Sequence, residues 1–213
     1  RTHRYSASKG ISSLRRAQAV YYKNRFDVSL DPEKEVIATL GSKEGLANLA
    51  MAITAPGDVM LVPNPSYPIH PYGFMIAGGT LRHLPTLHDG AFNPEEYMRS
   101  LARAVSHSVP KPVAVVVSFP SNPTAQLCDL DFYTELVNFA RKHGLWLLSD
   151  LAYAEIYFNG KPPPSILEVK GAKEVAVEFT SLSKTFSMPG WRMGFAVGNQ
   201  KLIDALTRIK SYL

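Results

Sequence analysis

The amino-acid sequence predicts an α/β protein, a three-layer α/β/α sandwich built around a mainly parallel mixed sheet. Short apolar runs alternate with helical patterns along all 213 residues. The runs are apolar at consecutive positions, as in Val113-Ala-Val-Val-Val117, which is typical of strands buried on both faces. The alternation of strands with helices along the chain favours parallel strands with helices on both sides of the sheet.

Each expected element is bounded by residues that favour turns or helix ends. The strands are expected at residues 35–40, 59–62, 80–84, 113–118, 145–149, 175–179 and 193–197. The helices, which show apolar residues at helical spacing, are expected at residues 10–26, 46–54, 69–77, 94–104, 130–143 and 201–212. Turns are indicated by Asp31-Pro32, Pro56-Gly57 and Gly78-Gly79, and Gly144 ends the helix that precedes it.

Composition narrows the function classes. The net charge is +5, but the basic residues are scattered, which disfavours nucleic-acid binding. The single cysteine, Cys128, rules out an internal disulfide framework and fits a reducing, cytoplasmic compartment. No run is long enough to cross a membrane, and the six histidines lack metal-ligand spacing. We therefore expect a cytoplasmic protein with a small-molecule ligand, no metal, and one domain over residues 1–213 that is a fragment of a longer chain.

Polar or aromatic side chains follow nearly every predicted strand. Ligands of such sheets bind at the carboxyl ends of the strands. The residues that follow the strands are Ser42 and Lys43, then Tyr67, then Asn122, then Asp150 and Tyr153, and finally Ser181, Ser183 and Lys184. Arg192 comes eight positions after Lys184, across a Pro-Gly turn. We expect these side chains to meet at one edge of the sheet.

Two of these positions can be interpreted either as part of a binding site or as ordinary structural residues. Lys184 is either a nucleophile, whose pKa would fall in a confined site, or a solvated loop lysine. The turn Gly41-Ser42-Lys43 offers free N–H groups at a helix start, which suits a phosphate. Alternatively, Ser42 is simply the N-cap of that helix. The hydroxyls of Ser181 and Ser183 and the fork of Arg192 could add phosphate donors.

The other positions suggest a flat ring. Asp150 ends an apolar strand, so its carboxylate needs a cation, which is either a protonated ring nitrogen or a nearby lysine or arginine. Asn122 and Tyr153 are neutral donors, although Asn122 could serve only as a turn residue. Tyr67 could stack on a ring or merely pack. Together the set suggests pyridoxal 5′-phosphate, a phosphorylated ring that bears an aldehyde.

Several spaced motifs resemble the class I and II, fold-type-I pyridoxal-phosphate aminotransferases. These are Asn122-Pro-Thr, Asp150 with Tyr153, Ser181-Leu-Ser-Lys184 and Gly190-Trp-Arg-Met-Gly-Phe195. The resemblance implies that Lys184 is the Schiff-base lysine and forms the catalytic set with Asp150 and Tyr153. It also implies cofactor contacts by Ser42, Lys43, Tyr67, Asn122, Ser181, Ser183 and Arg192. Tyr5 would reach the phosphate in the neighbouring subunit, which requires a homodimer with shared active sites.

Within that family, three segments resemble the bacterial glutamate–pyruvate (alanine) aminotransferases and their LL-diaminopimelate relatives. They are Gly41-Ser-Lys-Glu-Gly-Leu46, Asn64-Pro-Ser-Tyr-Pro-Ile-His70 and Asp150-Leu-Ala-Tyr-Ala154. Ala125 and the Leu151-Ala152 pair depart from the usual pattern. The resemblance implies ping-pong transfer of an amino group between an amino acid and a 2-oxo acid. Alternatives are an LL-diaminopimelate or aspartate-type enzyme, a cofactor-sensing regulatory domain, and a lyase or acyl-transferring synthase. The N-terminal segment and the small domain with the carboxylate-binding arginine are expected to lie outside residues 1–213.

Overall fold

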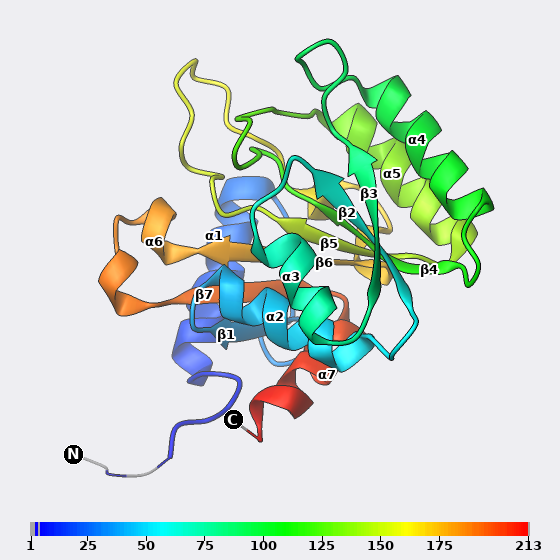
Figure 1. The fold of residues 1–213 in the computed structure, drawn as a ribbon. Helices are drawn as coiled ribbons and strands as arrows, with labels where there is room; N and C mark the ends of the chain where they lie inside the picture. Colours follow the sequence, from blue (N-terminus) through cyan, green and yellow to red (C-terminus); the bar gives the residue numbers. More distant parts are fainter. Residues whose placement is uncertain (1–2, 4, 213) are drawn as a thin grey trace.

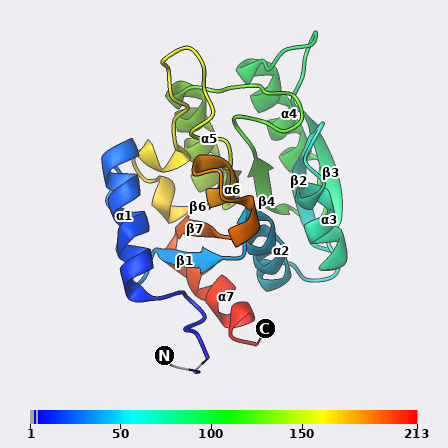
Figure 2. The ribbon, with the colours of Figure 1, turned by 90° about the vertical axis from the view of Figure 1, so that its left-hand side faces the viewer.

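The computed structural model describes residue 3 and residues 5–212, and it shows one seven-stranded sheet between two layers of helices (Figures 1 and 2). The strands are β1 (Val36–Thr39), β2 (Val59–Asn64), β3 (Thr80–Pro85), β4 (Pro112–Val117), β5 (Trp146–Asp150), β6 (Ala176–Ser181) and β7 (Gly194–Gly198). The α-helices are α1 (Ser12–Phe26), α2 (Ser42–Ile53), α3 (Ile69–Ile76), α4 (Pro94–Ser106), α5 (Leu130–His143), α6 (Leu182–Thr185) and α7 (Gln200–Lys210). Short 3₁₀ turns are η1 (Ile166–Glu168), η2 (Ala172–Glu174) and η3 (Pro189–Trp191).

The strand order is β1-β7-β6-β5-β4-β2-β3. Four neighbouring pairs are parallel, namely β2 with β3, β2 with β4, β4 with β5, and β5 with β6. Only β7 runs against its neighbours β1 and β6. The predicted mainly parallel mixed sheet is therefore confirmed. The carboxyl ends of β2, β4, β5 and β6 lie at one edge, and the beginning of β7 lies at the same edge.

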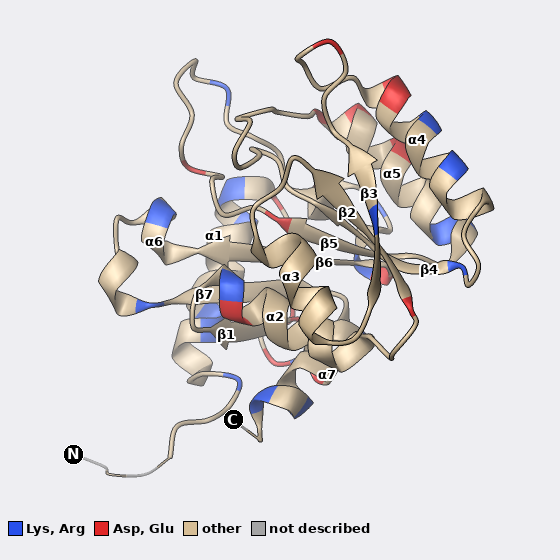
Figure 3. Cartoon of the chain, in the orientation of Figure 1, with Lys and Arg blue, Asp and Glu red and all other residues tan. Residues whose placement is uncertain are grey.

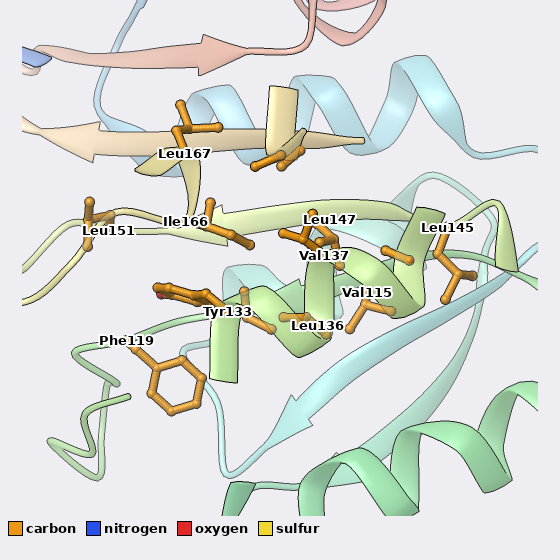
Figure 4. Close-up of a cluster of buried hydrophobic side chains, with 14 of the residues drawn as sticks. Val115, Phe119, Tyr133, Leu136, Val137, Leu145, Leu147, Leu151, Ile166 and Leu167 are labelled. Atoms are coloured by element: carbon orange, nitrogen blue, oxygen red, sulfur yellow. The ribbon is translucent and has the colours of Figure 1, made fainter. Parts of the chain in front are cut away.

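The sheet separates two hydrophobic cores. Side chains of α1, α4 and α5 pack on one face, and side chains of α2, α3 and α7 pack on the other. Figure 4 shows part of the first core, where Leu136 and Val137 of α5 meet Val115 and Leu147 of the sheet. Most residues of β4, β5, β6 and β7 are buried. This burial explains why these strands are apolar at consecutive positions.

Helix ends follow local chemistry for the most part. The Asn93 side chain caps α4 by accepting the N–H of Glu96, and Asp129 caps α5 by accepting the N–H of Phe132. Gly144 ends α5 in the left-handed conformation, with φ of 69°. No helix within residues 5–212 is long and apolar enough to cross a membrane.

The start of α2 differs from the expectation. The helix begins at Ser42 rather than Leu46, so the predicted turn is its first turn. Gly41 occupies the N-cap with φ of 82°, and no side chain caps the helix. The N-cap interpretation of Ser42 was therefore wrong, and its hydroxyl is not used in capping.

Glu178 on β6 is a buried carboxyl group surrounded by donors. Its Oε1 accepts the hydroxyls of Tyr22 and Ser165, while Oε2 accepts the Ser149 hydroxyl and the Ile166 N–H. Burial raises the pKa of Glu178 from 4.5 to about 7, because the cost of desolvating the charge outweighs the hydrogen bonds that lower it. The hydroxyls around Oε1 can turn to accept a proton, whereas the Ile166 N–H can only donate. A neutral Glu178 can therefore donate its proton to one of its three hydroxyl partners.

We expect this carboxyl to weaken the fold as the pH rises. The unfolded chain loses the Glu178 proton near its ordinary pKa of 4.5, while the folded chain keeps it to about 7. The free energy of unfolding should therefore fall through this window and level off above it, by a total on the order of 3 kcal/mol. Urea unfolding of the wild type and Glu178→Gln, at pH values from about 5 to 8, measures this difference. Identical pH dependence in the two proteins would contradict it.

Candidate functional site

A cavity of about 210 Å³ opens at the edge where the parallel strands end. The ten side chains that the sequence analysis placed in one subunit's site all line it, namely Ser42, Lys43, Tyr67, Asn122, Asp150, Tyr153, Ser181, Ser183, Lys184 and Arg192. Gly41 and Ala152 complete the lining. Tyr5 is not part of it, and its side chain is fully exposed. The structure thus brings ten of the eleven residues together within one chain.

One end of the cavity is formed by the start of α2 and the segment before β7. A Cβ atom on Gly194 would lie 2.8 Å from the Ser42 nitrogen and 2.6 Å from the Thr180 oxygen. Only glycine lets β7 approach this turn so closely. Arg192 has φ of 51°, and a Cβ on Gly41 would lie 3.2 Å from its Nη2. The guanidinium therefore lies beside the open N–H groups of the helix start.

Positive charge dominates the cavity lining. Lys43, Lys184 and Arg192 face a single carboxylate, Asp150. Within the part of the chain that the structure describes, the ion pairs involve none of these three cations. Figure 3 shows Lys and Arg on α6, at the start of α2 and in the segment that leads into β7. This charge and the dipole of α2 favour an anion such as a phosphate.

Asp150 has a partner that the sequence analysis missed. Its Oδ2 lies 2.9 Å from Nε2 of His70, and its Oδ1 accepts the N–H of Ala152 at 3.3 Å. Both side chains are buried, His70 at 1% exposure. Of the two alternatives for Asp150, the nearby lysine or arginine is not found among the ion pairs of the described residues, and His70 takes that place. His70 follows Tyr67 by three positions, and their rings meet edge to face at 6.1 Å. The spacing from Tyr67 could have indicated that His70 belongs to the site. However, the apolar neighbours Ile69 and Phe74 are typical of a core segment.

Several of the other lining side chains contact one another. The Asn122 side-chain amide donates to the Tyr153 hydroxyl at 3.1 Å, although Asn122 also lies in a turn. Arg192 Nη1 donates to the Ser183 hydroxyl at 3.5 Å. Lys43 Nζ lies 5.7 Å from the centre of the Tyr67 ring. Lys184 lines the cavity from α6, and its side chain is exposed, as in the solvated alternative for this residue.

The chain matches known proteins along its whole length. The family model for aminotransferase class I and II matches residues 1–213. The putative aminotransferase AatC of Rhizobium meliloti (strain 1021) is 65% identical over 213 residues, which is 100% of this chain and 51% of AatC. Glutamate-pyruvate aminotransferase AlaC of Escherichia coli (strain K12) is 51% identical over 211 residues, which is 99% of this chain and 50% of AlaC. An LL-diaminopimelate aminotransferase of Natranaerobius thermophilus is 46% identical over 209 residues, which is 98% of this chain and 53% of that enzyme.

A solved structure shows the same fold. The apo-BacF structure from Bacillus subtilis superposes with a TM-score of 0.91 and 36% sequence identity. The match covers 99% of this chain and 54% of BacF. The chain thus spans about half the length of the curated relatives it matches.

The pairing of His70 with Asp150 can be tested by stability. We expect His70→Phe to lower the free energy of unfolding by about 1–3 kcal/mol, because the buried Asp150 carboxylate loses a hydrogen bond. His143→Phe is the matched control, since His143 is exposed on α5, where it stacks on Phe139. The control should change stability by less than about 0.5 kcal/mol. Denaturant unfolding measures both, and equal losses would contradict the assignment.

Proposed function

The chain belongs to the aminotransferase class I and II family, and from this premise we propose that it carries the cofactor site of a pyridoxal 5′-phosphate-dependent aminotransferase. Such an enzyme moves an amino group between an amino acid and a 2-oxo acid. The observation that carries the proposal is the meeting of Lys184, Asp150 and Arg192 around one cavity. An amine, a carboxylate and a guanidinium suit the aldehyde, the ring nitrogen and the phosphate of this cofactor.

The other lining residues fit the same group. The N–H groups at the start of α2 and the hydroxyls of Ser181 and Ser183 would join Arg192 in holding the phosphate. Asn122 and Tyr153, already joined by a hydrogen bond, would bind the ring hydroxyl. Tyr67 would pack its ring on the cofactor ring.

Each chemical role follows from the environment of the side chain. When bound, the cofactor supplies a ring that accepts electrons from the substrate's α-carbon. Lys184 would first hold the aldehyde carbon and then, once free, move the proton at the α-carbon as a general acid and base. The Asp150 carboxylate, fixed by His70 and the Ala152 N–H, would hold a proton on the ring nitrogen. Tyr153 would donate its hydroxyl to the ring oxygen.

We expect Lys184→Ala to abolish the covalent link to the cofactor and to lower transamination by at least roughly 10²–10⁴-fold, because the proton-transfer group is lost. Borohydride reduction of the intact enzyme with cofactor, followed by peptide mass spectrometry, locates the modified lysine. Lys142→Ala is the control, because Lys142 is an exposed lysine on α5. A reducible adduct and full activity in Lys184→Ala would refute the proposal.

For the substrates, we propose alanine with pyruvate and glutamate with 2-oxoglutarate. The 51% identity to the glutamate-pyruvate aminotransferase AlaC supports this pair. The LL-diaminopimelate aminotransferase at 46% identity supports the second candidate. We expect kcat/KM for alanine to exceed that for LL-diaminopimelate by at least about 100-fold. Keto-acid release from a panel of amino donors, including aspartate, measures this ratio. A preference for LL-diaminopimelate would favour the second candidate.

We also propose that the enzyme is a homodimer in which Tyr5 reaches the partner's cofactor phosphate. Large apolar side chains are exposed on the segments around Lys184 and Arg192, with Phe186 at 56% and Trp191 at 73%. Exposed apolar surface of this kind is typical of a covered interface. Sedimentation of the intact enzyme should give the mass of two chains, and Tyr5→Phe should weaken cofactor binding by several-fold. A monomer with full cofactor affinity would exclude a shared site.

A further inference from the structure

A second, much smaller cavity lies beside the buried His70. It is lined by His70 of α3, by Tyr97 of α4, and by residues such as Pro63 and Phe119 near the carboxyl ends of β2 and β4. The cavity therefore lies where the two helical layers meet around the edge of the sheet. Its volume, about 10 Å³, is at the lower limit of the roughly 10–15 Å³ that one buried water molecule needs.

Two polar atoms on this lining have no partner. Within the part of the chain that the structure describes, His70 Nδ1 and the Tyr97 hydroxyl are buried without a hydrogen bond. Each residue is only 1% exposed, so bulk water does not reach it. Buried polar groups are almost always hydrogen-bonded, to protein or to ordered water, because leaving them unpaired is costly.

The two atoms have complementary roles. Nε2 of His70 faces the Asp150 carboxylate, so Nε2 carries the ring proton and Nδ1 is an acceptor in the neutral imidazole. Desolvation by burial raises the pKa of Tyr97, so its hydroxyl keeps its proton and can donate. A single water molecule can accept from the tyrosine while it donates to Nδ1.

We infer that one water molecule binds in this cavity and bridges the Tyr97 hydroxyl to His70 Nδ1. The hydrogen-bonded chain then runs from Tyr97 through the water and His70 to Asp150. By occupying Nδ1 with a donor, the water keeps the ring proton on Nε2, where it points at the carboxylate. Tyr97 is thus a positioning residue that acts on Asp150 from the opposite helical layer. This effect on the cofactor rests on the proposed function, whereas the water and its effect on His70 do not.

The first test uses the protein without cofactor. Tyr97→Phe removes one hydroxyl, and Tyr133→Phe is a close control. Tyr133 is also fully buried with an unpartnered hydroxyl among the described residues, but it does not line this cavity. In nitrogen-15 NMR of the histidine rings, we expect Tyr97→Phe to move the His70 Nδ1 signal toward that of an unbonded imidazole nitrogen. Tyr133→Phe should leave it unchanged. An unchanged signal in Tyr97→Phe, or equal shifts in both variants, would overturn the inference.

A second measurement needs no variant to fold. A high-resolution crystal structure of the wild-type enzyme should show an ordered water within hydrogen-bonding distance of both Nδ1 and the Tyr97 oxygen. A dry cavity, or a direct tyrosine–histidine contact, would refute the bridge.

The third measurement separates this inference from the proposed function. In the loaded enzyme, we expect Tyr97→Phe, but not Tyr133→Phe, to shift the pH dependence of the cofactor's absorbance. If the wild type binds no cofactor, the proposed function fails while the NMR result still decides the bridge. If the cofactor binds and the pH dependence of its absorbance is the same in Tyr97→Phe and Tyr133→Phe, Tyr97 is not a positioning residue.

Discussion

The direction of the strands is the constraint on which the site depends. Because β2, β4, β5 and β6 run the same way, the segments that follow them must emerge at one edge of the sheet. The one reversed strand, β7, begins at that edge, and its first residues follow Arg192. The reversal therefore places Arg192 beside the start of α2, on the cavity that Asp150 also lines. A fully parallel sheet would have sent the beginning of β7, and Arg192 with it, to the other edge.

Strands β5 and β6 each carry one buried carboxyl group, and the two have different environments. Ser149 pairs with Glu178 and Asp150 pairs with Phe179 in the register of the two strands. Glu178 is enclosed by hydroxyls and one N–H inside the core that contains α1 and α5. Asp150 faces the cavity and is held by His70 and a single N–H. Burial within the core favours the protonated form of Glu178, which has a structural role. Asp150 instead borders a cavity that a cationic group of a ligand can enter.

The regular elements could be predicted because their signals are local. Consecutive apolar residues mark strands buried on both faces, and caps such as Asn93 and Asp129 mark helix starts within a few positions. The start of α2 was harder, since a glycine N-cap has no side chain to reveal it. Glu178 was missed because a single acidic residue in an apolar run does not show which donors surround it.

The sequence by itself determined which residues follow each strand, and those residues line the cavity together. It did so because chain order fixes what comes after a strand, and parallel packing then brings the strand ends together. Only the tertiary structure decided the partners. His70 and Asp150 are 80 positions apart, and Tyr97 belongs to the opposite helical layer. Such meetings depend on strand order and on how two layers pack around one sheet edge, and no local pattern of residues encodes either.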